Sequence, residues 1–356
     1  MCPKGVSKMQ EIMKLQLKVV PELLEIMEER YNILKNIYYN QPIGRRLLAA
    51  NVNLSERVVR SEINFLKEQK LIDVHSLGMT ITKEGEEVLQ GLKDFVGKLK
   101  KFQSIECYIK ETLNLKEVII VPGDVDEDRA VLRELGKIAS NYIKNILKDG
   151  IIISLTGGNT VKEIIDNFPK INNFNDITVL PARGGIGKNI EIQSNTLVGR
   201  LASKLNANYE ILHIPDNISE DTFEALINEK GIREIFNKIE NSYIVIHGIG
   251  DAVEMSYKRD LSRDIIENIK KLNAVGEAYG HYFNYNGEIV HSMPTIGINA
   301  DKISFIENMI AVAAGKYKAK AIISAVRDRT NEVLITDEAT AKEIYNILST
   351  DNNMLY

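Results

Sequence analysis

The sequence predicts an α/β protein in two parts, a winged helix-turn-helix followed by a doubly wound, mostly parallel sheet. Two helical patterns separated by a tight turn lie between residues 43 and 69, and two short β-like runs follow them. From residue 117 onward, apolar β-branched runs alternate with helical stretches, as in parallel sheets that are covered on both faces. Several of these runs end in glycine-rich turns, and the carboxyl ends of parallel strands are where ligands bind.

The chain has the length and composition of a globular protein of two or three domains. It contains 356 residues, of which 44% are hydrophobic and 26% are charged. Cys2 and Cys107 have neither metal-ligand spacing nor the numbers of a disulfide framework. No segment resembles a signal peptide or an apolar membrane span. We therefore expect a cytoplasmic protein that needs no metal and no cofactor.

Charge is distributed unevenly along the chain. The net charge is −4, from 45 Lys and Arg residues and 49 Asp and Glu residues. Residues 1–115 hold 18 of the basic and 15 of the acidic residues, so subtraction leaves 27 and 34 for the remainder. A mildly basic front and an acidic rear fit a nucleic-acid-binding module joined to a domain of another kind. The asymmetry is too small to establish this by itself.

The front of the chain is predicted to be helical. The pattern at 10–38 is helical with a break at Pro21. A short helix at 43–50 is followed by a turn and then by a longer helix, which begins after Ser55, a plausible N-cap, and ends near Gln69.

The longer of these two helices has two different faces. Val59, Ile63 and Leu66 recur at helical spacing and are expected to face a core, whereas the opposite side is polar and basic. Arginine pairs with guanine and asparagine with adenine, and both reach phosphates, so this side has the chemistry of DNA contact. With the arginines of the preceding helix and the N-cap serine, the predicted DNA-binding residues are Arg45, Arg46, Ser55, Arg57, Arg60, Ser61 and Asn64.

A β-hairpin is predicted directly after this helix. Short β-like runs at 71–74 and 79–82 flank Ser76-Leu77-Gly78, which predicts a wing. Helix, turn, basic helix and wing together favour binding to double-stranded DNA. The alternative is a solvated charged face on a small helical domain.

Residues 83–113 predict one long helix with a heptad stripe. Its apolar residues follow alternating steps of four and three, with Glu106 breaking the register. They are Val88, Leu92, Phe95, Leu99, Phe102, Ile109 and Leu113. Such a stripe predicts a homodimer or homotetramer, and the alternative is a helix that packs its stripe onto its own domain. The predicted divisions are a DNA-binding domain at 1–85, a helical linker at 86–115 and an effector domain at 116–356.

The rear of the chain alternates between the two kinds of secondary structure. The predicted strands are 118–121, 151–155, 177–180, 209–212, 243–246, 309–313 and 333–336. The predicted helices between them include 129–147, 224–239 and 260–272.

The turn at Thr156-Gly157-Gly158-Asn159-Thr160 has the character of an anion cradle. It lies between a buried strand and the start of a helical stretch at 161–167. Glycines let the backbone approach a phosphate, the first N–H groups of the helix point at it, and threonine hydroxyls add donors. The alternative is an ordinary tight turn, because the pattern is neither a Walker loop nor a dinucleotide-binding fingerprint.

Three further strand ends carry glycine turns, at 181–185, 247–251 and 314–318. Four such turns at one edge of a sheet would form a pocket for a small polyanion. Arg183 offers a two-pronged donor and Lys318 a point charge near a helix start. Glu277 can accept hydrogen bonds from sugar hydroxyls.

These motifs resemble those of the SorC/DeoR-type sugar-binding transcriptional regulators of bacteria. The motifs are Thr156-Gly157-Gly158-Asn159-Thr160, Pro181-Ala182-Arg183-Gly184-Gly185, Gln193-Ser194-Asn195, Gly248-Ile249-Gly250, Gly276-Glu277, Gly315-x-x-Lys318-Ala319-x-Ala321-Ile322 and Leu334-Ile335-Thr336-Asp337-Glu338. The front half, from Ile33 to Gln69, resembles members of this family that regulate glycolytic operons.

The resemblance implies an effector domain similar in fold to glucosamine-6-phosphate deaminase and ribose-5-phosphate isomerase. It also implies a repressor relieved by a glycolytic sugar phosphate, chiefly fructose-1,6-bisphosphate. One phosphate would be held by the 156–160 turn with Arg183 and Gln193, and the second by Arg259 and Lys318. The implied effector-binding residues are Thr156, Gly157, Gly158, Asn159, Thr160, Arg183, Gly184, Gly185, Gln193, Gly250, Asp251, Arg259, Glu277 and Lys318.

Two other functions are considered beside this one. A sugar-phosphate isomerase or deaminase-like enzyme would need an acid and a base, for which the candidates are His247, Asp251, Glu277 and His281. The histidine-containing catalytic loop of the deaminases is not reproduced after Gly250, so we expect no catalytic residues. The other function is a sugar-phosphate sensor that acts through protein partners without DNA. Such a sensor would not need the exposed polar side chains Arg57, Arg60 and Asn64.

Overall fold

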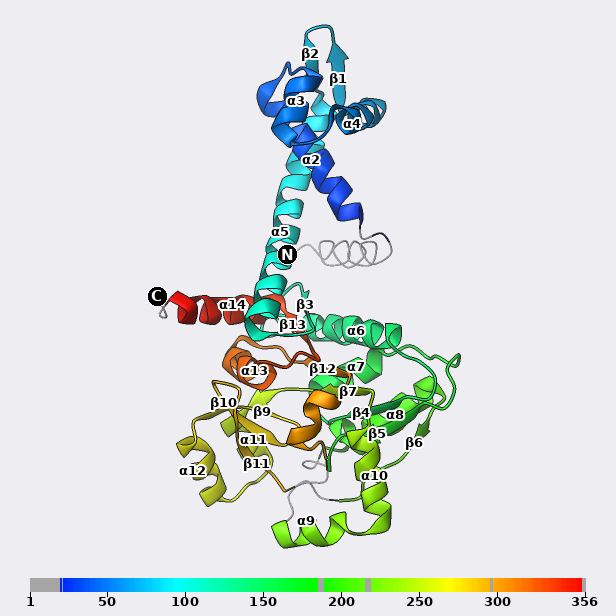
Figure 1. The fold of residues 1–356 in the computed structure, drawn as a ribbon, viewed down its shortest axis with the longest axis vertical. Coiled ribbons are helices and arrows are strands. Elements are labelled where there is room, and N and C mark those ends of the chain that lie inside the picture. The colour runs from blue at the N-terminus through cyan, green and yellow to red at the C-terminus, as the bar shows by residue number, and fades with distance from the viewer. Residues whose placement is uncertain (1–19, 21, 185–188, 215–218, 295–296, 354–356) are drawn as a thin grey trace. The chain divides into compact units, whose positions relative to one another are not determined.

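The computed structural model describes residues 20, 22–184, 189–214, 219–294 and 297–353 of the chain (Figure 1). The chain divides into two compact units, Met1–Gln103 and Ser104–Tyr356. The part of the predicted first helix that precedes residue 22 lies, apart from Val20, outside the described residues.

The first unit is a small helical domain with a β-hairpin. Its elements are α2 (Glu22–Asn40), α3 (Arg45–Val52), α4 (Glu56–Glu68), β1 (Ile72–His75), β2 (Gly78–Ile81) and the first part of α5 (Lys83–Leu113). The predicted helix-turn-helix and wing are therefore confirmed in order and, within a few residues, in extent.

Helix α4 forms as its sequence pattern predicts. The hydroxyl of Ser55 caps the helix by accepting a hydrogen bond of 3.3 Å from the amide of Val58. Val59, Ile63 and Leu66 are at most 3% exposed and belong to the apolar core of the unit. The other side of the helix is thereby left to solvent.

The wing is an antiparallel pair whose turn is fixed by one glycine. Strand β1 pairs with β2 in a register that places His75 opposite Gly78. Gly78 has a φ of +140°, and a Cβ there would lie 2.9 Å from the backbone of Ile43. The close approach lets Ile43 pair with Met79 and ties the wing to the chain before α3.

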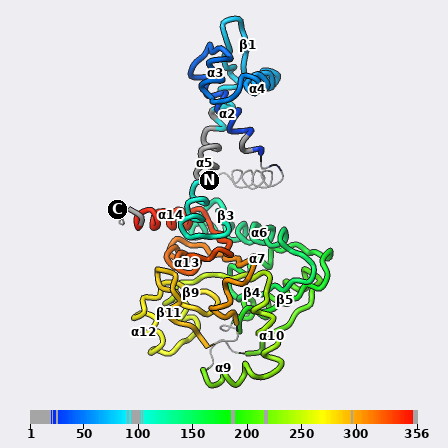
Figure 2. Tube along the Cα trace, viewed as in Figure 1, coloured from blue at the N-terminus to red at the C-terminus, as the bar shows by residue number. Residues whose placement is uncertain are grey.

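The second unit is built on a seven-stranded parallel sheet, whose path Figure 2 traces along the Cα atoms. The strand order is β3 (Glu117–Val121), β13 (Glu332–Asp337), β12 (Asn308–Val312), β7 (Ile244–His247), β4 (Ile152–Leu155), β5 (Thr178–Pro181) and β6 (Asn208–Tyr209). Each neighbouring pair is parallel. All seven predicted strands exist, although β6 is shorter than expected. The four strands with glycine turns are neighbours, so their turns meet at one edge.

Along the chain, the helices of this unit alternate with its strands (Figure 1). They are α6 (Arg129–Asn145), α7 (Asn159–Asn167), α8 (Ser194–Leu205), α9 (Glu220–Ile227), α10 (Lys230–Glu240), α11 (Ala252–Lys258), α12 (Arg263–Lys271), α13 (Ala319–Val326) and α14 (Glu338–Asn353), with 3-10 turns η1 (Ile190–Ile192), η2 (Ala300–Phe305) and η3 (Lys316–Lys318). Apolar residues of α6, α7 and α8 share one buried core with the strands. The single helix predicted at 224–239 is in fact two, because the chain breaks at Asn228 and Glu229.

A second sheet was not predicted from the sequence. It is antiparallel, in the order β11 (Ile289–Ser292), β10 (His281–Asn284), β9 (Ala274–Ala278) and β8 (Gly250–Asp251). Helix α13 packs against β9 and β10. These strands are short and mix glycine, histidine and aromatic residues, so they lack the alternating apolar pattern by which strands are found in a sequence.

Helix α5 has the bounds of the long helix predicted at 83–113. Ile109 and Leu113, which occupy heptad positions, are fully buried against the chain itself. The C-terminal end of the stripe thus packs onto its own domain, as in the alternative considered from the sequence. Self-association through the remaining heptad positions stays a prediction.

Candidate functional site

A cavity of about 310 Å³ lies where the carboxyl ends of β4, β5 and β7 meet. Twelve of the fourteen implied effector-binding residues line it: Thr156, Gly157, Gly158, Asn159, Thr160, Arg183, Gly184, Gln193, Gly250, Arg259, Glu277 and Lys318. Gly185 lies outside the described residues. Among those described, Asp251 does not line the cavity, because its carboxylate caps α11 by accepting a hydrogen bond from the amide of Glu254.

The glycine turn after β4 forms one side of the cavity. A Cβ at Gly157 would lie 2.5 Å from the carbonyl oxygen of Ile192, so only glycine fits there. The amide of Gly158, whose φ is +124°, donates to the same carbonyl at 2.9 Å. Helix α7 then begins at Asn159, and its first residues line the cavity. The unpaired amides at a helix N-terminus favour a bound anion.

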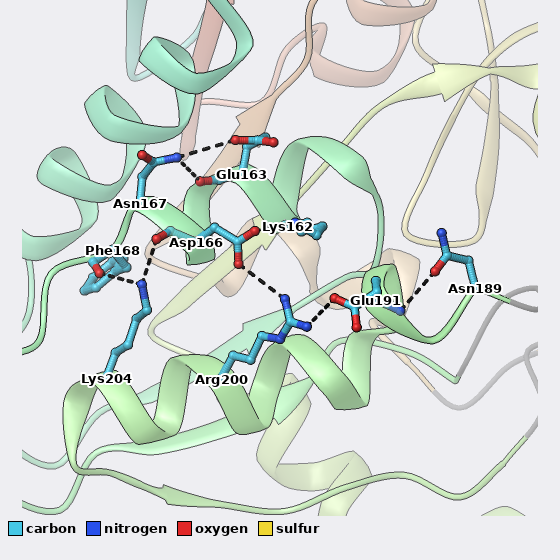
Figure 3. Close-up of polar contacts among 9 residues, drawn as sticks. All are labelled: Lys162, Glu163, Asp166, Asn167, Phe168, Asn189, Glu191, Arg200 and Lys204. Carbon is cyan, nitrogen blue, oxygen red and sulfur yellow. Dashed lines mark hydrogen bonds and ion pairs between the residues drawn. The ribbon is translucent and has the colours of Figure 1, made fainter. Parts of the chain in front are cut away.

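A network of ion pairs and hydrogen bonds links α7, α8 and η1 (Figure 3). Arg200 of α8 donates to Asp166 of α7 at 3.3 Å and also to Glu191 of η1. Lys204 donates to the carbonyls of Asp166 and Phe168, both at 2.8 Å, at the C-terminal end of α7. Residues of η1 and of α7 line the cavity, whereas Arg200 does not. Arg200 therefore joins two elements of the cavity wall without touching the cavity itself.

We expect Arg200→Ala to weaken effector binding roughly two- to fivefold, because two partly exposed ion pairs are lost and each contributes little. The measurement is a calorimetric titration of the full chain with fructose-1,6-bisphosphate at low and at high salt. Salt should narrow the gap between variant and wild type, since it screens exposed pairs. Lys342→Ala, which breaks an ion pair with Glu338 on α14, is the control and should bind as wild type. Equal binding by Arg200→Ala at low salt would contradict the expectation.

Two arginines and a glutamate form a buried charged group in the wall of the cavity. Arg183 and Arg259 donate to the same oxygen of Glu277, Oε1, at 3.1 and 2.8 Å. The amide of Gly280 donates to that oxygen as well, at 2.8 Å. Burial by itself would raise the pKa of Glu277, but the charges of Arg259 and Arg183 outweigh it and the pKa is lowered. Glu277 is therefore ionised at neutral pH.

Arg183 is held in place by glycines on both sides. Gly280 has a φ of +100° in the two-residue turn between β9 and β10, and a Cβ there would lie 3.1 Å from the guanidinium carbon. Gly297 pairs with the backbone of Arg183, and its own Cβ would lie 3.0 Å from that of Arg183. The guanidinium, in a side chain only 1% exposed, is thus fixed before any ligand arrives.

Two lysines near η3 have different surroundings. Lys318 lines the cavity, and burial lowers the pKa of its ammonium group. Lys316, which could have shared its role, pairs with Asp124 at 2.7 Å and does not line the cavity. Of these two lysines, Lys318 is the one placed to reach a ligand in the cavity.

Several lining residues were not singled out in the sequence. Lys258 and Glu254 line the cavity as an ion pair of 2.6 Å on α11, and only their i,i+4 spacing signalled the pair. Tyr279 belongs to the unpredicted antiparallel sheet turn. The others are Val161, Asn189, Ile192 and Met255, whereas Ser194, Gly248 and Ile249, which also line the cavity, belong to motifs quoted from the sequence.

Of the candidate acids and bases, only Glu277 lines the cavity. His247 is fully buried, and its Nε2 lies 2.8 Å from Glu332. His281 is engaged by Ser292 and by the carbonyl of Ile298, and burial lowers its pKa. A glutamate whose pKa is lowered by two arginines is a poor proton acceptor, so the cavity is better suited to binding than to acid–base chemistry.

All seven predicted DNA-contact residues are exposed. They are Arg45, Arg46, Ser55, Arg57, Arg60, Ser61 and Asn64. The hydroxyl of Ser55 also caps α4. Arg46 lies 3.6 Å from Glu56, an exposed pair that DNA phosphates can displace. Several apolar side chains are also exposed in the same unit, among them Leu47 on α3, Val58 on α4 and Leu77 at the turn of the wing.

In the described part of the chain, no helix is both long and apolar enough to cross a membrane. Within the same residues, His, Cys, Asp and Glu side chains form no group of three or more that could hold a metal ion.

Comparison with known proteins matches both units. Residues 98–346 match the family model of a sugar-binding domain, and residues 26–96 match that of the CggR N-terminal DNA binding domain. The central glycolytic genes regulator of Priestia megaterium is 40% identical over 94% of this chain and 98% of its own length. The regulator of the same name from Bacillus subtilis is 37% identical over 94% of this chain and 99% of its own.

Solved structures agree with these matches. A SorC family transcriptional regulator from Enterococcus faecalis covers 68% of this chain and 99% of its own, with 33% identity and a TM-score of 0.63. The full-length sorbitol operon regulator of Klebsiella pneumoniae covers 89% of this chain and 99% of its own at 18% identity, with a TM-score of 0.62, and so supports the fold alone. The chain therefore belongs to the SorC family of sugar-binding transcriptional regulators, within the group of central glycolytic genes regulators, and is a regulator rather than an enzyme.

Proposed function

We propose that this protein represses a glycolytic operon by binding operator DNA through α4 and the β1–β2 wing. Fructose-1,6-bisphosphate, bound in the cavity of the second unit, relieves the repression. The DNA-contact set is Arg45, Arg46, Ser55, Arg57, Arg60, Ser61 and Asn64, with Asn64 and the arginines as the main base and phosphate donors.

One observation supports a bisphosphate as the effector: two arginines from different parts of the cavity wall share one carboxylate. Arg183 and Arg259 both donate to Oε1 of Glu277. We assign one phosphate to the glycine turn, Arg183 and Gln193, and the other to Arg259 and Lys318. Glu277, which lies between the two arginines, then faces the sugar. A ligand with a phosphate at each end of a polyol uses both regions at once, whereas a monophosphate uses one.

The mechanism we infer is a shift between two populations. The effector must bind more tightly to the state with lower operator affinity, since only a difference in affinity can shift the equilibrium. Couplings of this kind are usually about 1–3 kcal/mol, or roughly 5–150-fold in affinity. The oligomer that binds the operator is proposed to be a homodimer or homotetramer, in which the spacing of the DNA-binding domains depends on α5.

Calorimetric titration of the full chain with fructose-1,6-bisphosphate tests the effector. We expect saturable binding, and weaker binding of fructose-6-phosphate and glucose-6-phosphate by at least roughly tenfold, because each leaves one phosphate region empty. The samples are assayed for product at the end. Equal affinity for the three ligands would contradict the bisphosphate assignment, and turnover of any of them would revive the enzyme.

A further inference from the structure

Glu277 has an unusual position for a residue that binds a sugar. One of its oxygens accepts three hydrogen bonds, from Arg183, Arg259 and the amide of Gly280. All three charged side chains are at most 4% exposed, so water scarcely screens them. The protein has thus placed a fixed negative charge within hydrogen-bond distance of both guanidinium groups that would attract a phosphate.

Apart from Lys318, the charged side chains that line the cavity fall into two groups. Lys258 and Glu254 pair with each other, and their side chains are 59% and 40% exposed. Arg183, Arg259 and Glu277 form the buried group, whose net charge is +1 when Glu277 is ionised. Replacing Glu277 by a neutral residue would make this group +2. Glu277 therefore weakens the attraction of the cavity for any anion.

A fixed carboxylate treats two kinds of anion differently. An oxyanion without hydroxyl donors brings only oxygens, which the carboxylate repels in a site with little screening. A phosphate ester of a polyol brings hydroxyl groups, which donate charge-assisted hydrogen bonds to the carboxylate. The same residue can thus oppose one ligand and favour the other.

We propose that Glu277 is a selectivity residue that excludes inorganic oxyanions from the cavity and admits phosphate esters with hydroxyl groups near their phosphates. The inference rests on the proposed sugar-phosphate function and adds to it a means by which a cavity lined by four basic side chains rejects simple anions. Glu277 does this by acting as counter-ion to both arginines and as acceptor for the ligand's hydroxyls.

The test compares sulfate, which carries no hydroxyl donor at neutral pH, with fructose-1,6-bisphosphate on the Glu277→Gln variant. Glutamine keeps the shape and one acceptor oxygen but removes the charge. We expect sulfate to bind roughly tenfold or more tightly to the variant than to wild type, and to raise its melting temperature correspondingly. The affinity ratio between the bisphosphate and sulfate should fall by a similar factor.

Glu267→Gln is the control, because it removes a carboxylate from an exposed ion pair with Lys270 on α12, outside the cavity lining. It should change sulfate affinity by less than about twofold. Unchanged or weaker sulfate binding by Glu277→Gln would overturn the proposal and leave Glu277 with a structural role. If wild type fails to bind the bisphosphate while Glu277→Gln gains sulfate binding, the proposed effector is wrong and the selectivity stands.

A second measurement needs no variant and guards against misfolding of Glu277→Gln. Hexane-1,6-diol bisphosphate has two phosphates on a chain of six carbons but lacks hydroxyls. Wild type should bind it at least roughly tenfold more weakly than fructose-1,6-bisphosphate, because a desolvated carboxylate is left without the hydroxyl donors. Equal affinity for the two bisphosphates would overturn the proposal directly.

Discussion

The double variant Arg57→Ala/Arg60→Ala is expected to lose operator binding by about 100-fold or more. Both side chains are exposed on the face of α4 that is opposite Val59, Ile63 and Leu66, so their removal does not disturb the core. Each arginine contact to a base edge or phosphate is typically worth about 1–3 kcal/mol. The measurement is a fluorescence-anisotropy titration of labelled operator DNA, repeated across a series of salt concentrations.

The salt series separates DNA contact from a general effect of charge. Each phosphate contact that is lost should flatten the slope of log affinity against log salt by about 0.9. The control is Lys270→Ala/Lys271→Ala, which also removes two positive charges, but from exposed positions on α12. It should bind the operator as wild type does. A steeper slope in the arginine variant would contradict phosphate contact. Unchanged affinity of the arginine variant for operator DNA would show that the polar side of α4 is only a solvated surface. It would favour a sensor that acts without DNA.

The front of the fold was predictable because its signals are local. The N-cap at Ser55, the apolar spacing of Val59, Ile63 and Leu66, and the turn at Gly78 each specify a short segment. The inner strands of the parallel sheet were predictable for a related reason, since strands buried on both faces are continuous apolar runs.

The antiparallel sheet could not be found in the same way. Strand β8 has two residues, and β9 contains Gly276 and Glu277 in place of apolar residues. Gly276 is required because a Cβ there would lie 2.3 Å from the hydroxyl of Ser324 on α13. These residues are determined by contacts with α13 and with Arg183, which are distant in the sequence, so no local pattern reveals the strands.

The site was predictable as a set of residues but not as an arrangement. The glycine turns lie at the edge of the sheet where the cavity is found, and the family resemblance supplied Gln193, Arg259 and Lys318, all of which line the cavity. The sequence did not reveal that Arg183 and Arg259, which lie 76 positions apart, share one oxygen of Glu277. That contact changes the interpretation of Glu277 from a simple acceptor of sugar hydroxyls to a charge that both arginines need.

Arg183→Ala is expected to keep operator binding and to abolish the response to fructose-1,6-bisphosphate. The side chain is 1% exposed and lines the cavity, so it can offer two charge-assisted hydrogen bonds to a phosphate. At about 1.5–3 kcal/mol each, their loss should weaken the bisphosphate by roughly 100-fold or more. The measurement is anisotropy of labelled operator DNA at increasing effector concentration, with calorimetry of the effector alone.

The control must separate loss of the phosphate donor from damage to the fold. Glu277 keeps Arg259 and the amide of Gly280 as partners in the variant, although burial makes some loss of thermal stability expected. Lys316→Ala removes a cation two positions from Lys318 that pairs with Asp124 outside the cavity lining, and it should respond to the effector as wild type. A folded Arg183→Ala protein that no longer binds operator would contradict the division of labour between the two units. A different contrary result is that the bisphosphate releases the Arg183→Ala protein from the operator at the concentrations that release wild type. That result would show that Arg183 does not hold a phosphate, because no other described residue places a guanidinium group at the end of β5.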